Sequence, residues 1–341
     1  MSIRFAAIGL NHGHIYGQVE CLRQAGAEFV SYYASEPELV AEFSAKYPRV
    51  RLARSIEEIL EDETIQVITS ASIPVDRAPL GIRAMQHGKD YLTDKPGFVS
   101  LEQLEEGRRI HEQTGRIYSV CFSERLLNRA TVKASELVQT GAIGRVIQTV
   151  GFGPHRIFGY TTKRPDWFFE KQYFGGIIND IASHQVDQFL HFTGSTEAEI
   201  VASQVGNLNH PDYPNFEDFG DLTLSSSRGT GYIRVDWFTP DGLNTWGDVR
   251  LFILGTDGYI ELRKNCDIEG RAGENHLFLV DQKGMQYINC SDVHVPFGEQ
   301  FLNDVRSRTE TAMTHAHCFL ASELALRAQA QARRLETAQR V

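Results

Sequence analysis

An imidazole and two carboxylates recur at helical spacing in the stretch from Gly175 to Asp187. Asp180, His184 and Asp187 stand at i, i+4 and i+7, which predicts that all three lie on one face of a helix. Histidine titrates near neutral pH, and a carboxylate can fix its tautomer and stabilise its charged form. The three side chains therefore suit general acid–base catalysis, although a solvated stripe on an ordinary helix would give the same pattern.

Composition indicates a soluble globular protein with two domains. The chain has 341 residues, which is more than a single hydrophobic core usually organises. Apolar residues make up 42% and charged residues 23% of the chain, and the net charge is -10. An acidic chain without a basic block is not expected to bind nucleic acid or anionic membranes.

Cysteine usage and the N-terminus indicate a cytoplasmic protein. The five cysteines are scattered and include no C-x-x-C pair, so we expect reduced thiols rather than a disulfide framework or a zinc ribbon. The N-terminus runs directly into an apolar strand, residues 3–8, and no apolar stretch approaches the length of a membrane span. We therefore expect neither a secretion signal nor a transmembrane helix.

The first part of the chain alternates short apolar runs with segments of helical periodicity. Strands are predicted at residues 3–8, 28–33, 65–69, 90–93 and 116–121, and helices at residues 37–47, 56–60, 75–87 and 101–113. This alternation predicts an α/β fold with a parallel sheet, whose ligands bind at the carboxyl ends of the strands. We assign residues 1–122 to a Rossmann-type dinucleotide-binding domain.

A possible dinucleotide loop follows the first strand and reads Gly9-Leu10-Asn11-His12-Gly13-His14. In such loops glycines let the backbone approach a pyrophosphate at a helix N-terminus. Only Gly9 matches G-x-G-x-x-G in register, because Asn11 and His14 occupy the second and third glycine positions. Asn11 tolerates left-handed backbone angles, but His14 requires room between helix and strand. The His-x-His pair could bind a metal ion, but no third ligand stands nearby in sequence, so no metal is expected.

The second strand of such a domain should end in an acid that binds the ribose hydroxyls of the dinucleotide. Ser35 and Glu36 stand there, with Glu36 slightly late for this role. No arginine is nearby in sequence to bind a 2'-phosphate, which slightly favours NAD(H) over NADP(H). Ser70, at the end of the next apolar strand, is a further candidate for cofactor binding.

A later strand ends in Asp94-Lys95-Pro96, and at this point the chain resembles the glucose-fructose oxidoreductase, inositol dehydrogenase and rhizopine-catabolism (Gfo/Idh/MocA) family of NAD(P)-dependent oxidoreductases. The family signature A-x-x-x-G-K-x-V-x-x-E-K-P resembles residues 84–96, with Asp94 in place of the usual Glu. A second signature, G-G-G-x-x-x-D-x-x-x-H-x-x-D, is matched by Gly175, Gly176, Asp180, His184 and Asp187.

The resemblance extends over nearly the whole chain, with informative departures. Residues 141–146, 164–168 and 255–261 resemble further family segments. The family's T-P-N-x-x-H appears here as Ser72-Ile73-Pro74-Val75-Asp76-Arg77, and the glycine loop is altered as described. These departures surround the expected cofactor, so they affect its binding mode most.

Alternating apolar residues from Arg145 onward predict a large, open, mostly antiparallel sheet with one face on helices. We assign residues 123–341 to an α+β domain for substrate binding and oligomerisation. A C-terminal helix is predicted over residues 312–339, packing back towards the first domain. Because the other face of the sheet needs a cover, we expect a homo-oligomer, either a dimer or a tetramer.

The resemblance implies hydride transfer between a nicotinamide cofactor and a secondary alcohol of a sugar, cyclitol or related polyol. We assign His184 as acid and base, Asp180 as the group that orients its ring, and Lys95 as the group that polarises the substrate oxygen. The candidates for cofactor binding are Gly9, Asn11, His12, Gly13, His14, Ser35, Glu36, Ser70, Asp94, Lys95 and Pro96. The candidates for substrate binding are His155, Arg156, Tyr160, Trp167 and Asp187.

Two alternatives to this function remain open. The same residues could serve an epimerase, lyase or glycosidase that oxidises its substrate transiently with a tightly held NAD. The altered glycine loop also allows a nucleotide- or sugar-sensing protein without catalysis, although Lys95, Asp180 and His184 together argue against this.

Overall fold

The structure is a computed structural model that describes residues 2–157 and 164–336, and the chain forms two compact units. The first unit comprises Met1–Cys121 and Pro296–Phe319, and the second comprises Phe122–Val295 and Leu320–Val341. The chain therefore returns to the first unit after most of the second unit is complete. Among the described residues, no helix is both long enough and apolar enough to cross a membrane.

The first unit is built on a six-stranded parallel sheet with the order β3-β2-β1-β4-β5-β6. Its strands are β1 (Arg4–Ile8), β2 (Glu28–Tyr33), β3 (Arg51–Leu52), β4 (Val67–Ser70), β5 (Asp90–Asp94) and β6 (Tyr118–Cys121). This is the strand order of dinucleotide-binding sheets, and it confirms the Rossmann-type prediction. The order reverses between β1 and β4, so the loops that follow these two strands meet at the switch point where ligands bind.

Helices connect or follow these strands, and a later helix of the unit packs against the first of them. They are α1 (His14–Gln24), α2 (Pro37–Lys46), α3 (Ile56–Leu60), α4 (Pro74–Gln86), α5 (Leu101–Thr114) and the later α10 (Phe297–Ser307). In α1 the face formed by Ile15, Val19 and Leu22 is completely buried. Burial of each such side chain contributes about 1.5–3 kcal/mol, which fixes the helix and the loop before it.

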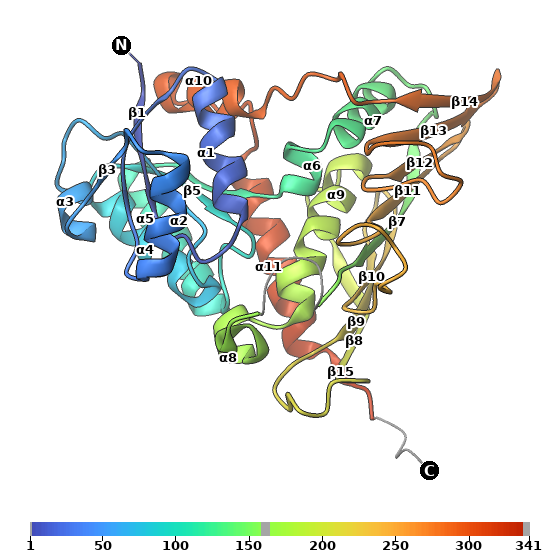
Figure 1. Cartoon of the computed structure of the whole chain (residues 1–341). Helices are drawn as coiled ribbons and strands as arrows, with labels where there is room; N and C mark the ends of the chain where they lie inside the picture. Colours follow the sequence, from blue (N-terminus) through green and yellow to red (C-terminus); the bar gives the residue numbers. More distant parts are fainter. Residues whose placement is uncertain (1, 158–163, 337–341) are drawn as a thin grey trace. The chain divides into compact units, whose positions relative to one another are not determined.

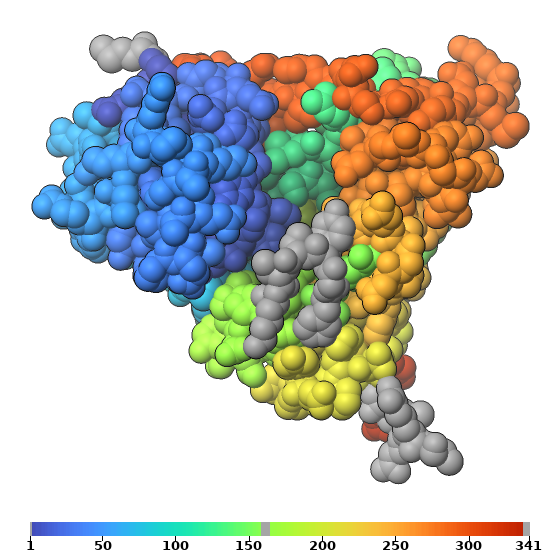
Figure 2. Space-filling model, in the orientation of Figure 1, coloured from blue at the N-terminus to red at the C-terminus, as the bar shows by residue number. Residues whose placement is uncertain are grey.

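The second unit contains a nine-stranded sheet with the order β14-β13-β12-β11-β7-β10-β9-β8-β15. Its strands are β7 (Val146–Pro154), β8 (Glu199–Gly206), β9 (Phe219–Ser225), β10 (Thr230–Asp236), β11 (Arg250–Gly255), β12 (Tyr259–Arg263), β13 (His276–Asp281), β14 (Gly284–Asn289) and β15 (Arg333–Arg334). The sheet is mostly antiparallel, as predicted, but β7 pairs with β10 and β8 with β15 in parallel. The β13–β14 hairpin reaches the surface (Figure 2, orange), where Met285 is 85% exposed.

Helices cover one face of this sheet (Figure 1). They are α6 (Ser123–Leu126), α7 (Arg129–Gln139), the 3-10 helix η1 (Asp166–Phe169), α8 (Lys171–Phe174), the π-helix η2 (Ile178–Ala182), α9 (Ser183–Thr193) and α11 (His315–Gln331). α9 packs against β7 and β10 over strand glycines. A Cβ on Gly151 would lie 2.6 Å from Gln185 Cγ, and one on Gly231 would lie 2.8 Å from Phe189 Cδ2. Larger residues at these two strand positions would therefore push α9 off the sheet.

The C-terminal helix is shorter than the prediction of residues 312–339. The carboxylate of Asp304 accepts hydrogen bonds from the backbone N–H groups of Thr311 and Ala312, and α11 begins only at His315. At its other end the chain leaves the helix and Arg333 pairs with β8. A turn cap and an added strand thus replace helical turns that the composition favoured; residues 337–339 of the prediction lie outside the described part.

Candidate active site

A pocket at the switch point of the first unit collects four of the eleven predicted cofactor residues, namely Gly9, Asn11, Ser35 and Glu36. It has a volume of about 280 Å³ and opens between the ends of β1, β2 and β4 and the start of α4. Its lining includes Gly9, Asn11, Ser35, Glu36 and Ser72. Position and lining fit the adenosine half of a dinucleotide.

Gly9 is the loop glycine that the backbone requires. Its φ is +79°, and a Cβ there would lie 1.8 Å from the Oγ of Ser72, which follows β4. The backbone N–H of Gly9 donates to the carbonyl of Tyr33, and the carbonyl of Gly9 accepts from the N–H of Ala71. The three strand ends are thus tied together at the pocket.

Glu36 follows the end of β2, where hydrogen bonds hold its carboxylate in place. Its carboxylate accepts hydrogen bonds from Asn11 Nδ2 at 2.6 Å and from Ser35 Oγ at 3.0 Å. Burial alone raises the pKa of Glu36, but these hydrogen bonds outweigh it and lower the pKa. The structure also brings Arg83 to the same pocket, although it is distant in sequence, and Arg83 donates to Glu57 at 2.6 Å.

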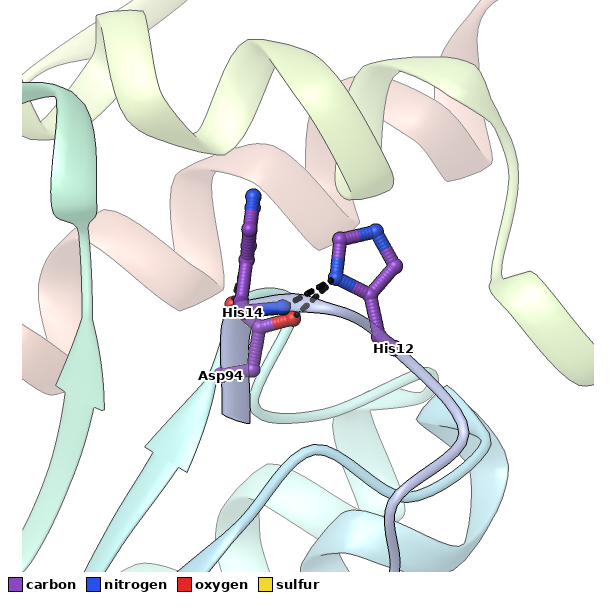
Figure 3. A group of neighbouring side chains, drawn as sticks. All are labelled: His12, His14 and Asp94. Atoms are coloured by element: carbon purple, nitrogen blue, oxygen red, sulfur yellow. Dashed lines mark hydrogen bonds and ion pairs between the residues drawn. The ribbon is translucent and has the colours of Figure 1, made fainter. Parts of the chain in front are cut away.

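His12 and His14 meet Asp94 beside this pocket loop (Figure 3). His14 Nδ1 lies 2.9 Å from Asp94 Oδ1, and His12 Nδ1 lies 3.4 Å from Asp94 Oδ2. The two imidazole rings are 4.1 Å apart and nearly perpendicular. Arg77, completely buried, approaches Asp94 Oδ2 to 3.2 Å from the other side. The two histidines therefore have a third group beside them, Asp94 of β5, which their spacing in the sequence did not reveal.

Charge and burial set the protonation of this cluster. Burial by itself raises the pKa of Asp94, but the charges of His14 and Arg77 outweigh it and hold the pKa well below its usual range. Desolvation and the neighbouring His14 lower the pKa of His12 well below its ordinary value. Asp94 is therefore ionised and His12 neutral near pH 7. His12 Nδ1 also accepts the backbone N–H of His14, the first residue of α1, at 3.2 Å.

Lys95, Pro96 and Ser70 are buried at the ends of β5 and β4. The Lys95–Pro96 peptide bond is cis, and Arg77 donates hydrogen bonds to the carbonyls of both residues. Ser70 Oγ lies 2.8 Å from Ser72 Oγ. These contacts fix the backbone that carries the Lys95 side chain.

In the second unit, a carboxylate and an amide hold the start of the helix that carries His184. Gly176 has a φ of +92°, and the first two N–H groups after it would otherwise be unsatisfied. The N–H of Ile177 donates to Glu217 at 3.0 Å, and the N–H of Ile178 donates to Gln329 Oε1 at 2.9 Å. Gly176 is needed because a Cβ at this position would lie 2.3 Å from Gln329 Cδ.

The predicted single helical face is interrupted. Asp180 lies within the π-helix η2, whereas His184 and Asp187 lie in α9. The wider turn of a π-helix breaks the regular helical period between Asp180 and His184. Asp180 is half-buried. Desolvation lowers the pKa of Arg164, and the negative charge of Asp180 partly opposes this shift. His184 is 2% exposed and Asp187 is 0% exposed. A solvated stripe is therefore wrong for His184 and Asp187.

Glu124 is the centre of a buried polar network next to His184. Its Oε2 accepts hydrogen bonds from Gln185 Nε2 at 2.8 Å, Gln188 Nε2 at 3.2 Å and Lys264 Nζ at 3.1 Å. Lys264 also donates to the backbone carbonyl of Glu124 and to Gln188 Oε1, each at 3.1 Å. The ring of Phe122 lies edge-on to His184 at 6.4 Å. These hydrogen bonds connect α6, α9 and the residue that follows β12.

The two charged partners respond differently to burial. Desolvation alone raises the pKa of Glu124, but the positive charges of Lys264 and His184 outweigh it and lower the pKa to about 2. Desolvation lowers the pKa of Lys264 more than the attraction of Glu124 raises it. The lowered pKa of Glu124 indicates a favourable ion pair, whereas the lowered pKa of Lys264 indicates that burial of its ammonium group is costly. Both groups are charged in the folded protein, because three hydrogen bonds satisfy the Lys264 ammonium.

Asp187 is held by Arg125. The guanidinium donates from Nε and Nη2 to the two carboxylate oxygens, both at 2.7 Å. This paired geometry is typical of strong arginine–carboxylate contacts. Asp187 is therefore part of a polar network of the second unit.

The other predicted substrate residues have defined neighbours. His155 lies between Trp237 and Trp246, with ring separations of 5.3 and 4.8 Å, and its Nδ1 is 3.0 Å from the Gly153 carbonyl. Arg156 donates to the carbonyls of Pro240 and Leu243. Trp167 is half-buried beside Phe168 in η1. Arg164 stacks over Phe168 rather than pairing with an exposed carboxylate. Tyr160 lies outside the described residues.

Sequence reasoning missed Glu124, Arg125, Lys264 and the role of Arg77. Glu124 and Arg125 directly follow a buried strand, and charged residues at that position are a signal that could have been used. Lys264 has no such signal, because it comes from a distant hairpin. Arg77 was visible only as a departure from a family motif.

Comparison with known proteins identifies the family. Residues 3–122 match the oxidoreductase family with an NAD-binding Rossmann fold, and residues 131–261 match the GFO/IDH/MocA C-terminal domain. The crystal structure of a proposed oxidoreductase from Erwinia carotovora atroseptica SCRI1043 is 48% identical, with a TM-score of 0.95 over 98% of this chain and 100% of that chain. The chain belongs to the Gfo/Idh/MocA family of NAD(P)-dependent oxidoreductases.

Two characterised relatives are more distant. The scyllo-inositol 2-dehydrogenase (NAD(+)) of Bacillus subtilis strain 168 is 25% identical over 74% of this chain and 69% of the relative. The D-xylose dehydrogenase of Paenarthrobacter nicotinovorans is 28% identical over 42% of this chain and 38% of the relative. The chain thus matches less than half of the xylose enzyme and about two thirds of the inositol enzyme.

Proposed function

We propose that the protein is an NAD(H)-dependent dehydrogenase or reductase that acts on a secondary alcohol of a sugar, cyclitol or related polyol. The observation that carries this proposal is the pocket at the switch point, which Gly9, Ser35 and Glu36 line together. A bound nicotinamide dinucleotide accepts or donates the hydride. The inositol and xylose dehydrogenases among the relatives support a polyol as the substrate.

In this proposal His184 takes the hydroxyl proton during oxidation and returns it during reduction. A buried imidazole needs a nearby negative charge to accept a proton, and Glu124 supplies an attraction to His184. Asp180 orients the imidazole ring of His184, and Lys95 polarises the substrate oxygen. His155, Arg156, Tyr160, Trp167 and Asp187 are the proposed substrate contacts, and Arg125 holds the Asp187 carboxylate.

Binding and turnover together test this function. NAD(H) and NADP(H) are titrated in parallel by calorimetry, and the ultraviolet spectrum is checked for a nucleotide that co-purifies. A polyol screen then compares the parent with His184→Asn and Lys95→Met, which should bind NAD(H) but lose turnover by about 10²–10⁴-fold. His294→Asn, at an exposed histidine of the second unit, is the matched control. Failure of both cofactors to bind contradicts the proposal and favours a sensor.

Although the structure brings Arg83 into the pocket, we propose that Glu36 supports the NAD(H) preference, since its carboxylate would repel a 2'-phosphate. Glu36→Gln should weaken NAD(H) binding by about 10-fold and narrow the difference between NAD(H) and NADP(H). Glu38→Gln, an exposed acid two residues away, is the control. An unchanged preference in Glu36→Gln would assign selectivity to another group, with Arg83 the next candidate.

We also propose a cytoplasmic homo-oligomer, a dimer or tetramer, that uses the open face of the nine-stranded sheet. Arg234 and Arg250 lie 5.0 and 5.7 Å above the ring of Phe152 on adjacent strands and remain half-exposed. The five free cysteines support a reducing compartment. Light scattering should give a mass above that of one chain, and Arg250→Glu should reduce it; a monomeric parent would contradict the proposal.

A further inference from the structure

The departures from the family signatures meet at one place in the first unit. His14 stands where the third glycine of the loop is usual, Asp94 where glutamate is usual, and Arg77 where histidine is usual. In the structure Asp94 contacts both other residues, at 2.9 Å to His14 and 3.2 Å to Arg77. Asp94 therefore connects the other two departures from the family signatures in the structure.

Two of these residues, His14 and Asp94, join His12 in a set of candidate metal ligands. One ligand atom from each of His12, His14 and Asp94 lies within 4.8 Å of the others, and Figure 3 shows the side chains converging from the loop and from β5. Two ligands of a tetrahedral ion at about 2.0–2.2 Å are roughly 3.4 Å apart. The separation between His12 Nδ1 and Asp94 Oδ2 is 3.4 Å. We propose that His12, His14 and Asp94 bind a divalent transition-metal ion such as Zn²⁺.

The ligand types decide which class of ion fits. Two imidazole nitrogens favour Zn²⁺, Co²⁺, Ni²⁺ or Cu²⁺ over Mg²⁺ and Ca²⁺, which prefer oxygen ligands. Arg77 already compensates part of the Asp94 charge, so a hard cation gains little from this carboxylate alone. Arg77 also fixes the carboxylate, as an outer partner of a metal ligand does.

The ion can reach its ligands from solvent. The side chains of His12 and His14 are 31% and 41% exposed, and Gly13 between them has open space at its Cβ position. Without an ion, His14 Nδ1 donates a proton to Asp94 Oδ1. An ion that binds Nδ1 takes the lone pair of this nitrogen while the single proton of the neutral ring moves to Nε2, so a nitrogen–metal bond forms without net release of a proton.

The test uses the full chain without an affinity tag, freed of metal with a chelator and kept free of nucleotide. Co²⁺ is titrated with detection of its visible absorption bands, and Zn²⁺ is titrated by calorimetry. One ion should bind per chain. His12→Ala and His14→Ala should each weaken binding by more than about 100-fold. His87→Ala, at an exposed histidine of the same unit, should leave it unchanged.

Two outcomes overturn the site: no saturable binding of Co²⁺ or Zn²⁺, or equal affinities in the parent, His12→Ala and His14→Ala. Thermal unfolding of each variant verifies that the chain is folded. Because no nucleotide is present, this result is independent of the proposed dehydrogenase activity. Metal binding without NAD(H) binding would keep the site and reject the dehydrogenase, and the reverse result would do the opposite.

Discussion

The two units each hold a carboxylate among nitrogen-bearing side chains, but in different surroundings. In the first unit Asp94 meets two histidines whose side chains are 31% and 41% exposed. In the second unit Glu124 meets Lys264, Gln185 and Gln188, and the Lys264 side chain is only 3% exposed. The histidines of the first cluster are open to solvent and can bind a ligand, whereas Lys264 in the second network is closed to solvent. Similar residue types therefore form an accessible cluster in one unit and a buried structural network in the other.

Removal of Lys264 should give the largest stability change. Lys264→Met leaves the Glu124 carboxylate buried without its cation and should cost about 3–5 kcal/mol in urea unfolding at neutral pH. The double variant Glu124→Gln with Lys264→Met should recover most of this loss, because a whole buried pair can be replaced at little cost. A loss below about 1 kcal/mol for the single variant would remove the contrast between the two regions.

Acid should weaken the second network next. The pKa of Glu124 is lowered from the ordinary value of 4.5 to about 2, so the folded state binds this proton less readily than the unfolded state. The stabilisation is therefore complete above pH 4.5 and is lost as the pH falls towards 2. It should amount to on the order of 3 kcal/mol. The free energy of unfolding should fall more steeply with decreasing pH in the parent than in Glu124→Gln. The same pH dependence in both proteins would contradict the lowered pKa of Glu124.

The loop of the first unit offers a matched glycine pair. Gly9→Ala should cost about 2 kcal/mol or more, because φ is +79° and the new Cβ would meet Ser72 Oγ. Gly13→Ala, at a φ of -59° with open space, should cost about 0.5 kcal/mol or less. Thermal unfolding of both variants measures the difference. Equal losses would mean that the loop is free to rearrange at Gly9.

The exposed cluster should show the smallest effect. His14→Ala removes a contact to Asp94, but the His14 side chain is 41% exposed and Asp94 keeps its contact with Arg77. The free energy of unfolding should therefore change by about 1 kcal/mol or less. Chemical unfolding without metal measures it, with His87→Ala as the control. A loss above about 2 kcal/mol would make the cluster a structural element like the Glu124 network.

Local patterns predicted most of the fold. The apolar runs of the first unit predicted β2 over the observed residues Glu28–Tyr33, and β1 and β6 with a difference of one or two residues at one end. The two-residue strand β3 was missed, because Arg51 and Leu52 are both exposed and carry no pattern. β14 was missed for the same reason, since nearly all of its residues are exposed.

The candidate site was predicted by motif but not by contact. Gly9, Ser35 and Glu36 converge as expected, because strand ends of a parallel sheet meet at one edge. Spacing could not find Asp94 as the partner of His14, or Lys264 as the partner of Glu124, since these pairs form only when distant strands come together. The one-face prediction for Asp180 and His184 assumed a regular helix and could not anticipate the π-helix.

The contact between His14 and Asp94 also carries an evolutionary consequence. His14 Nδ1 lies 2.9 Å from Asp94 Oδ1, so a replacement at either position changes this contact. We therefore expect the residue at this loop position and the residue before the Lys-Pro pair to change together along lineages.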